Sequence, residues 1–438
     1  MKIIKRQVLI LIASCLMVFF LNCAHNGYGN KDENTELINV VRVNARELHV
    51  TGEQIPQAKT VANGANDFAF RLGASLLKNS GYENLVCSPY SVWLPLAALA
   101  NAATPQSKAA LLAALGASGL TDADVNMASS RMLYDLTNLR NRESAGFYNP
   151  LKIANAIFVG NTVTLRQEFA QTFMDYYRGS SINVDFSSRD AANAVNRWAS
   201  DNTDGLIKNL IQEFDPETVA AIASAIYFSD RWIWEFNPEQ TKEGVFHAPG
   251  GDTTAFYMLR EGNGQTYYED DKVQAMPLRF TTGGGLYIIL PKTGSAADVL
   301  ASMTNDYFNE IQMNSFQATG KLLLPRFSIE NTIDGLKKAL ESLGIPLFDE
   351  ASAPLTGGLI QEGLRVWLSN AVQKAVITVD EKGTTAAAVT VMAIAGTSMP
   401  MPTTPFEMIC DKPFAFILYN RTNDGGNQVL FTGVVNKP

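Results

Sequence analysis

Few residues in this chain of 438 could carry acid–base or nucleophilic chemistry. Histidine, the commonest base near neutral pH, occurs only at His25, His49 and His247. His25 and His49 precede the region predicted to fold, and His247 lies in a glycine-flanked turn where a surface position is expected. The sequence contains no HExxH, P-loop, GxSxG or strand-associated GxGxxG pattern. A serine or cysteine hydrolase needs a histidine base beside its nucleophile, so the sequence argues against both classes.

Carboxylates and cysteines form no clearer catalytic constellation. The run Glu269–Asp271 is typical of a solvated surface, and Gly283–Gly285 is interpreted as a hairpin turn. A glycosidase with two distant carboxylates stays open, because that chemistry leaves little local signature. Cys87 and Cys410 could form one disulfide, but neither has the spacing of a metal ligand. We therefore predict no enzyme, no metal site and no cofactor.

The net negative charge argues against nucleic acid as a partner. The net charge is −8, and losing the three basic residues of 1–22, a segment without acidic residues, takes it to −11. An acidic protein binds polyanions poorly, so no nucleic-acid partner is expected.

The N-terminus resembles an export signal. Basic residues in the first six positions precede an apolar core, Val8–Leu21, that is short for a membrane span. Cys23 follows at the position of a bacterial lipoprotein cleavage site, although Asn22 departs from the usual small residue, and a plain secretory signal is the alternative. We expect 1–22 to be removed, Cys23 to carry lipid and 23–60 to be a flexible tether. The protein would then be an envelope or cell-surface lipoprotein that touches the membrane only through this anchor.

One long stretch, residues 379–401, has an unusual composition for a loop. A charged turn, Asp380–Gly383, is followed by small and β-branched residues with no charge or proline until Pro400. Such residues fit a strand buried on both faces, and Gly383 offers a pivot. We interpret the stretch as a loop that can become a strand. An alanine-rich helix or an ordinary strand is the alternative.

Hydrophobic patterning predicts one folded domain, 61–438, with no internal linker. Helices are predicted mainly early and strands mainly late, which is typical of an α+β fold with a large, mostly antiparallel sheet. The helix 66–78 is expected to start near Asp67, and Ser88-Pro89 is expected to cap the helix 90–103. The remaining predicted helices are 107–115, 121–139, 166–177, 188–201 and 333–343. The predicted strands are 84–87, 151–159, 219–228, 272–280, 285–290, 322–329, 364–380, 414–420 and 429–435.

Several separated motifs together resemble the serpin family. The match runs from about 65 to 438, and each motif alone would be weak. The motifs are Asn84–Ser91 (NLVCSPYS), Asn196–Ile207, Ala225–Trp232 (AIYFSDRW), Leu324–Phe327 (LPRF), Asp411–Phe414 (DKPF), Phe431–Asn436 and the hinge-like Glu381–Thr384 (EKGT).

The resemblance implies a serpin fold, a monomer, an exposed reactive-centre loop at about 381–410 and two control points on the sheet. The implied hinge is Glu381, Lys382, Gly383, Thr384, Thr385, Ala386, Ala387 and Ala388, and the implied breach and shutter residues are Trp232, Ser88, Ser91, Ser224 and Gln373. Ser224 stands where the family commonly has asparagine, and Gln373 where it has histidine. We therefore expect a different shutter network, joining Ser224 and Gln373 to Ser88 and Ser91.

The family also implies a mechanism, namely suicide inhibition of a protease. A protease cuts the loop, and residues 384–397 enter the sheet with the acyl-enzyme attached. Family spacing places the cut between Thr397 and Ser398, with Ala395, Met399 and Met401 as alternatives. No Lys or Arg lies between Gly383 and Lys412, which favours elastase- or subtilisin-like serine proteases, or papain-like cysteine proteases, over trypsin-like ones. A noninhibitory binding module is the alternative.

Overall fold

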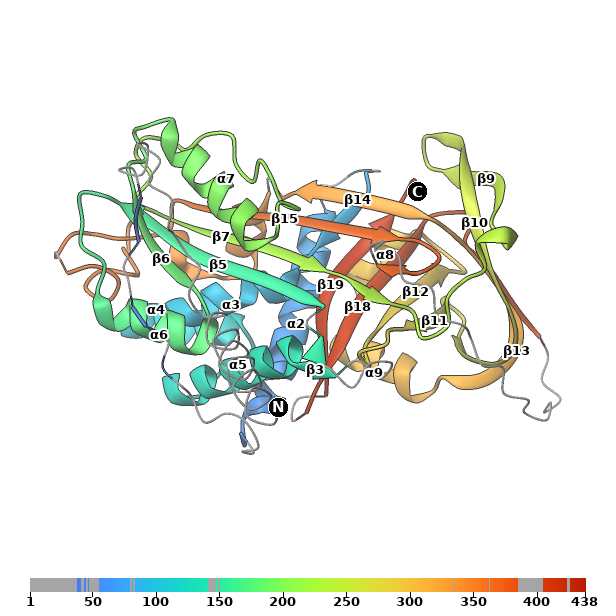
Figure 1. Ribbon diagram of the computed structural model, residues 1–438. Coiled ribbons are helices and arrows are strands. Elements are labelled where there is room, and N and C mark those ends of the chain that lie inside the picture. The colour runs from blue at the N-terminus through green and yellow to red at the C-terminus, as the bar shows by residue number, and fades with distance from the viewer. Residues whose placement is uncertain are drawn as a thin grey trace, which may run out of the picture. The chain divides into compact units, whose positions relative to one another are not determined.

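A computed structural model describes residues 38–40, 43–44, 46, 55–78, 81, 83–140, 147–148, 150–333, 335–361, 363–384, 405–423 and 426–438. The chain divides into residues 1–38 and a compact unit, 39–438. The second unit combines two large sheets with helices (Figure 1). The α+β class predicted from the sequence is confirmed, with helices packed on large, mostly antiparallel sheets.

The first sheet carries the elements that matter for function. Its strand order is β1 (Ile38–Val40), β6 (Ser180–Val184), β5 (Leu151–Gly160), β7 (Ala220–Phe228), β15 (Asn370–Val379), β16 (Gly383–Thr384) and β8 (Asp230–Arg231), with β14 (Phe327–Thr332) also paired to β15. β5 and β7 are antiparallel, whereas β7 and β15 run parallel and pair directly from Asn370↔Ala221 to Ala375↔Ile226. β7 is almost wholly buried, which explains its continuous apolar sequence.

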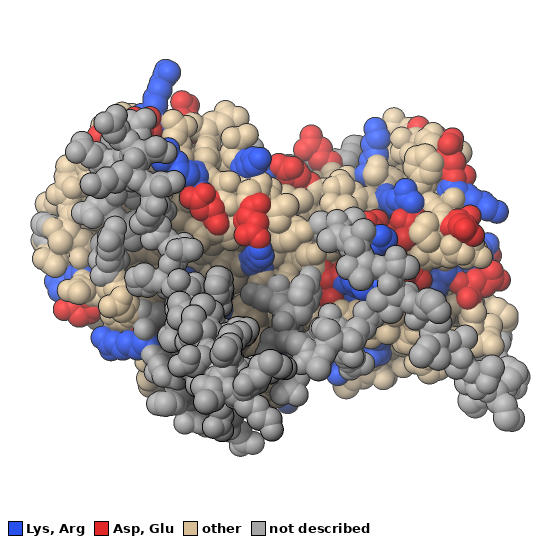
Figure 2. Space-filling model, viewed as in Figure 1, with Lys and Arg blue, Asp and Glu red and all other residues tan. Residues whose placement is uncertain are grey.

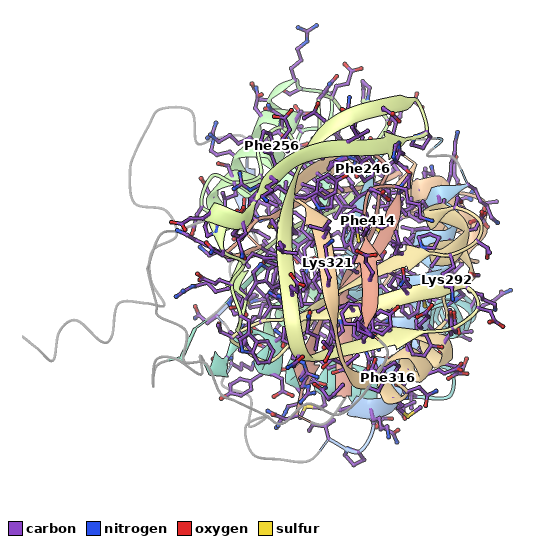
Figure 3. The ribbon with its side chains drawn as sticks, turned by 90° about the vertical axis from the view of Figure 1, so that its right-hand side faces the viewer. Phe246, Phe256, Lys292, Phe316, Lys321 and Phe414 are labelled. Atoms are coloured by element: carbon purple, nitrogen blue, oxygen red, sulfur yellow. The ribbon has the colours of Figure 1, made fainter. Side chains whose placement is uncertain are left out.

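The second sheet positions the chain that follows the loop. Its order is β17 (Phe406–Ile409), β13 (Phe316–Pro325), β10 (Gly251–Glu269), β11 (Val273–Arg279), β12 (Gly285–Pro291), β18 (Phe414–Thr422), β19 (Gly426–Val435) and β2 (Leu85–Cys87), and β9 (Lys242–Ala248) pairs with β10. Lys321 of β13, labelled in Figure 3, forms an ion pair with Glu407 of β17. On the β9–β10 hairpin Phe246 is buried and Phe256 is exposed, so one face of the hairpin packs inward. A two-stranded ribbon, β3 (Leu139–Arg140) and β4 (Phe147–Tyr148), lies apart from both sheets.

Helices cover both faces of the first sheet. α7 (Asp190–Asn202) contacts β5 and β7, while α3 (Pro89–Leu99) contacts β5, β7 and β19 (Figure 1). The other helices are α2 (Ala58–Leu77), α4 (Pro105–Ala114), α5 (Asp122–Thr137), α6 (Gln167–Tyr177), α8 (Ala296–Ser302), α9 (Asn305–Met313), α10 (Leu336–Ser342) and the 3-10 turns η2 (Pro238–Gln240) and η3 (Pro346–Phe348).

Near the start of the domain, one predicted boundary and two predicted local features differ from the structure. α2 begins at Ala58, so Asp67 lies inside it rather than at its start. Part of the predicted tether contacts the folded domain. Asn44 O accepts a hydrogen bond from Gln171 of α6, and Arg46 N donates one to Asp175 of the same helix. Ser88 does occupy the N-cap of α3, but its hydroxyl donates to Leu430 O instead of capping the helix.

The strand predictions failed where packing overrides local pattern. The run 322–329 is two strands, β13 and β14, separated at Arg326, and β15 starts at Asn370 rather than at 364. β6, β9, β10, α8 and α9 were missed. β10 is irregular in burial and its pairing with β13 shifts register between Gly262 and Gln265, which hides the period-two pattern. α8 did have a readable signal, the capping box Ser295–Asp298.

Candidate functional site

The candidate site lies on the first sheet and has two parts. We call the residues around β16 and β8 the breach, and the buried polar residues at the middle of β7 and β15 the shutter. The predicted bond Thr397–Ser398, the alternatives Ala395, Met399 and Met401, the hinge residues Thr385, Ala386, Ala387 and Ala388, and Cys23 all lie outside the described residues.

A tight turn after β15 returns the chain into the sheet. Asp380 Oδ1 accepts hydrogen bonds from the N–H groups of Lys382 (2.8 Å) and Gly383 (3.1 Å), and Asp380 N donates to Gly383 O (3.0 Å). Thr384 therefore pairs back with Val379, and Gly383 pairs with Arg231 of β8. A Cβ at Gly383 would lie 2.0 Å from Asp230 O, so only glycine fits this close approach.

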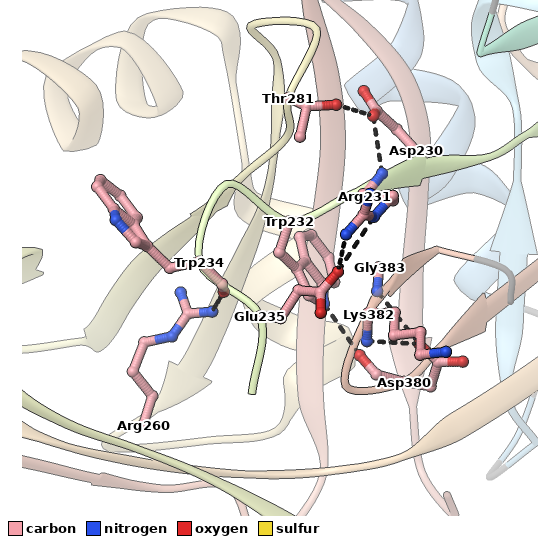
Figure 4. A network of polar contacts seen from close by, with 10 residues as sticks. All are labelled: Asp230, Arg231, Trp232, Trp234, Glu235, Arg260, Thr281, Asp380, Lys382 and Gly383. Carbon is pink, nitrogen blue, oxygen red and sulfur yellow. Dashed lines mark hydrogen bonds and ion pairs between the residues drawn. The ribbon is translucent and has the colours of Figure 1, made fainter. Parts of the chain in front are cut away.

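Trp232 holds this turn in place (Figure 4). Its indole Nε1 donates to Asp380 O at 2.9 Å, and its backbone N donates to Lys382 O at 2.8 Å. The buried ring stacks on Phe280 with centroids 4.8 Å apart and planes 12° apart. The predicted role of Trp232 as a breach residue thus has a physical basis, because one side chain joins the second sheet to the start of the hinge.

Glu381 forms an ion pair with Arg326, a partner that was not predicted from the sequence. The carboxylate is buried and accepts hydrogen bonds from Arg326 Nε (2.7 Å) and Thr241 Oγ1 (2.5 Å). Burial raises the pKa of Glu381, but the bonds from Arg326 and Thr241 outweigh burial and leave the pKa below its ordinary 4.5. Glu381 is therefore held as a carboxylate, and it fixes the hinge to the chain between β13 and β14.

Asp230 is a second missed residue of the breach, beneath Thr384. Its carboxylate accepts hydrogen bonds from Arg231 N, from Thr282 N and from the hydroxyls of Thr281 and Thr282. Burial raises its pKa, against the opposing effect of those donors. Its backbone N donates to Thr384 Oγ1 at 3.3 Å, and Thr384 is fully buried. The sequence does carry a signal for this residue, because Asp230 directly follows an apolar strand in the motif AIYFSDRW, where a buried charge needs partners.

The shutter forms around Gln373, but without Ser224. Gln373 Oε1 accepts from Ser88 N at 3.0 Å, and Gln373 Nε2 donates to Ser88 O and Ser91 Oγ, each at 2.7 Å. Gln373, Ser88 and Ser91 are all fully buried. The expected network of Gln373 with two serines is present, whereas Ser224 Oγ makes no hydrogen bond to any described residue. The prediction that Ser224 joins the network was wrong for this closed sheet.

Comparison with protein families decides the identity. Residues 63–438 match the family model described as "Serpin (serine protease inhibitor)". The chain belongs to the serpin family. Among curated proteins, it is 28% identical to the serpin alpha-1-antitrypsin 1-4 of Mus musculus over 391 residues, which cover 88% of this chain and 91% of the relative. It is 29% identical over 385 residues to a serpin-like protein, TK1782, of Thermococcus kodakarensis, covering 87% of each chain.

Solved serpins share its fold. Serpin48 of the insect Tenebrio molitor superposes with a TM-score of 0.74 at 28% identity, covering 88% of this chain and all of that one. The thermophilic serpin tengpin in its native state gives a TM-score of 0.76 at 24% identity, covering 90% and 96%. Serpins are mostly protease inhibitors rather than enzymes, although some do not inhibit.

β16 pairs with Val379 of β15 on one side and with β8 on the other. β7 and β15 pair directly with each other from Asn370↔Ala221 to Ala375↔Ile226. Within the described residues, no cluster of His, Cys, Asp and Glu could hold a metal ion.

Proposed function

We propose that this serpin is an irreversible inhibitor of elastase- or subtilisin-like serine proteases. The observation that supports inhibition is the burial of Gly383 and Thr384 in the sheet ahead of any cleavage. The first residues of the hinge, Gly383 and Thr384, are already paired in the sheet. The residues that follow in sequence, through Val391, are small or β-branched and could continue into a buried strand.

The proposed reaction begins with acylation of the protease by the loop. The protease's serine hydroxyl attacks the carbonyl carbon of Thr397 while its proton passes, through the protease's own base, to the amine of Ser398. The C–N bond breaks, and an ester joins the protease to Thr397. The strand 384–397, of which Thr384 is already paired, is then completed between β7 and β15, and its length is about 45 Å at about 3.3 Å per residue. The protease is carried along, and its active site is distorted before water can hydrolyse the ester.

The driving force comes from strand pairing. β15 has 10 residues and β7 has 9. Each added backbone hydrogen bond contributes about 0.5–1.5 kcal/mol net, so a full strand contributes on the order of 10 kcal/mol. The closed sheet would store that free energy until the loop is cut.

The loop sequence supports the target class. Small and apolar residues flank the proposed bond, and the loop has no basic residue for a trypsin-like pocket. Papain-like cysteine proteases form the equivalent thioester and are the second candidate target.

The test is to mix the protein with an elastase-type serine protease and analyse the mixture on a denaturing gel. A detergent-stable band at the summed mass, with a released fragment that starts at Ser398, is the expected result. Clean cleavage, with no such band for elastase-like, subtilisin-like and papain-like proteases, would support a noninhibitory binding module instead.

We also propose export and anchoring through lipid on Cys23, as the sequence motif suggests. Within the described residues, no helix is long and apolar enough to cross a bilayer. A Cys23→Ala variant expressed in a bacterium should move from the membrane fraction to the soluble fraction. Unchanged membrane association of that variant would reject the anchor.

A further inference from the structure

One arginine of the second sheet has no carboxylate partner among the described residues. Arg260 of β10 is half-buried, and its Nη2 donates a hydrogen bond to the backbone oxygen of Trp234 (Figure 4). The guanidinium carbon lies 4.3 Å from the centre of the Phe236 ring. Burial lowers the pKa of Arg260 to about 10, and no neighbouring carboxylate offsets that effect. The cation is therefore partly withdrawn from water without an anion beside it.

The loop after the hinge does not supply the missing carboxylate. Between Glu381 and Glu407 the sequence contains no Asp or Glu. Glu381 is already paired with Arg326. Glu407 is paired with Lys321. Because a guanidinium held away from water favours an anionic partner, Arg260 is suited to bind a carboxylate from another molecule.

Arg260 lies between the two described ends of the loop. On one side, Trp234 follows β8, the strand that pairs with Gly383 of the hinge. On the other side, Arg260 pairs with Leu322 of β13, and Leu322 pairs with Met408 of β17. Two strand spacings, about 10 Å, therefore separate Arg260 from the strand that follows the loop. A protease that cuts the loop must approach this part of the surface.

Trp234 gives the same place an exposed apolar side chain. Of the five tryptophans, only Trp234 is exposed, at 59%, and the other four are buried or half-buried. In Figure 4, Trp234 and Arg260 lie together, on the other side of Trp232 from the turn at Asp380. Tryptophan and arginine are the side chains that most often carry the binding energy of protein interfaces. The pair therefore has the composition of a protein-binding site.

We propose that Arg260 and Trp234 form a docking site for the target protease. The guanidinium binds an Asp or Glu side chain on the protease surface, and the indole packs on apolar surface beside that carboxylate. This inference rests on the proposed function. A guanidinium can bind a carboxylate through two parallel hydrogen bonds, and the bond to Trp234 O uses only one of its five donors. The site would let this serpin select among proteases that accept the same loop sequence.

Noncovalent binding tests docking separately from trapping. The probe is whichever of several elastase- and subtilisin-type proteases, each with its catalytic serine replaced by alanine, binds the parent chain most tightly. Arg260→Gln should raise the Kd by about tenfold, because a charge-assisted contact is lost, and Arg260→Lys should raise it less. Trp234→Ala should raise the Kd by about fivefold, because the apolar contact is lost.

The adjacent residues Leu364 and Arg365 provide matched controls. Leu364 is an exposed apolar side chain, and Arg365 donates hydrogen bonds to the backbone oxygens of Glu350 and Ala351. Leu364→Ala and Arg365→Gln should leave the Kd unchanged. Equal Kd values for Arg260→Gln and Arg365→Gln, or no binding by the parent chain, overturn the proposal. Failure of the proposed function looks different, because the parent chain would then bind the inactive protease through Arg260 but form no covalent complex with the active one.

A charge exchange tests the partner group. Arg260→Glu should weaken binding more than Arg260→Gln, because two carboxylates would then face each other. A protease variant in which one acidic surface residue is replaced by lysine should bind Arg260→Glu better than it binds the parent chain. The number of inhibitor molecules consumed per trapped active protease should stay the same in Arg260→Gln, since docking precedes cleavage. Absence of rescue by every acidic-to-lysine variant of the protease overturns the carboxylate as the partner.

Discussion

At the scale of single residues, the hinge is held by directional polar contacts. Trp232 and Arg326 hold the turn Asp380–Gly383 from two different segments, Trp232 through Asp380 O and Arg326 through the Glu381 carboxylate. Figure 2 shows charged side chains of both signs interspersed on the visible face, where surface pairs contribute little. Glu381 is different, because its carboxylate is buried and only its partner Arg326 reaches solvent. Loss of the Glu381 carboxylate should therefore lower the free energy of unfolding.

Glu381→Gln should lower the free energy of unfolding by about 1–3 kcal/mol at pH 7, because a buried charge-assisted pair is lost. The pKa of Glu381 lies below its ordinary 4.5, so its contribution is complete above about pH 4.5 and disappears as the pH falls through the lower folded pKa. Urea unfolding between pH 7 and pH 3 should show a smaller acid loss in the variant. Glu407→Gln, at an exposed pair with Lys321, is the control and should change little. An unchanged acid dependence in Glu381→Gln would contradict this role.

Thr384→Arg should convert the inhibitor into a substrate. Thr384 is fully buried in the intact sheet, so a long charged side chain at this position should displace the start of the hinge and oppose its return to the sheet after cleavage. A gel should show cleaved protein in place of the protease complex. Thr254→Arg, at an exposed position on β10, serves as the control and should still trap the protease. Full inhibition by Thr384→Arg would reject insertion.

At the scale of elements, the shutter joins β15 to α3 and β19. Gln373 reaches both serines at the start of α3, and Ser88 in turn bonds to Leu430 O of β19. Opening the sheet must move β15 relative to α3 or β7 relative to β5. The glutamine network thus opposes opening on one side only, since Ser224 on β7 takes no part.

Gln373→Leu should destabilise the closed form by about 1–3 kcal/mol, because it leaves Ser88 N without its acceptor and removes the amide that donates to Ser88 O and Ser91 Oγ. Ser224→Ala, in the same row, removes an unpartnered hydroxyl and should stay within about 0.5 kcal/mol of the parent. Unfolding in urea measures both. Equal losses in the two variants would mean that burial, and not the hydrogen bonds, determines stability at this row.

At the scale of the whole molecule, the fold is expected to be metastable. The two sheets and their helices are complete in the described residues, yet β7 and β15 form a parallel pair between antiparallel neighbours. An inserted strand would make that part of the sheet wholly antiparallel, the more stable pairing per residue.

Cleavage within the loop should raise the Tm by at least about 10 °C, since a gain on the order of 10 kcal/mol shifts the transition of a domain this size by that much or more. Differential scanning calorimetry of intact and cleaved protein is the measurement. The cleaved Thr384→Arg variant should show no comparable rise. A cleaved parent chain that melts with the intact one would mean that the sheet does not accept the strand.

Local sequence was sufficient for much of this protein. The motifs, the small-residue hinge and the buried strand β7 were readable, because each depends on neighbouring residues and their periodicity. Trp232 and Gln373 were found through family motifs. Boundaries such as Ala58 and Arg326 were missed, since tertiary packing overrides weak local preference there.

Contacts between distant segments were decided by the tertiary structure alone. Ser88 and Gln373 are 285 residues apart, and Arg326 and Glu381 are 55 apart, so no local pattern relates them. The burial of Asp230 and the pairing of Thr384 with two strands follow from how the sheet is assembled. The sequence alone shows a stretch of strand-like composition after Gly383. Only the folded sheet shows where the start of that stretch pairs, because register is a property of paired strands.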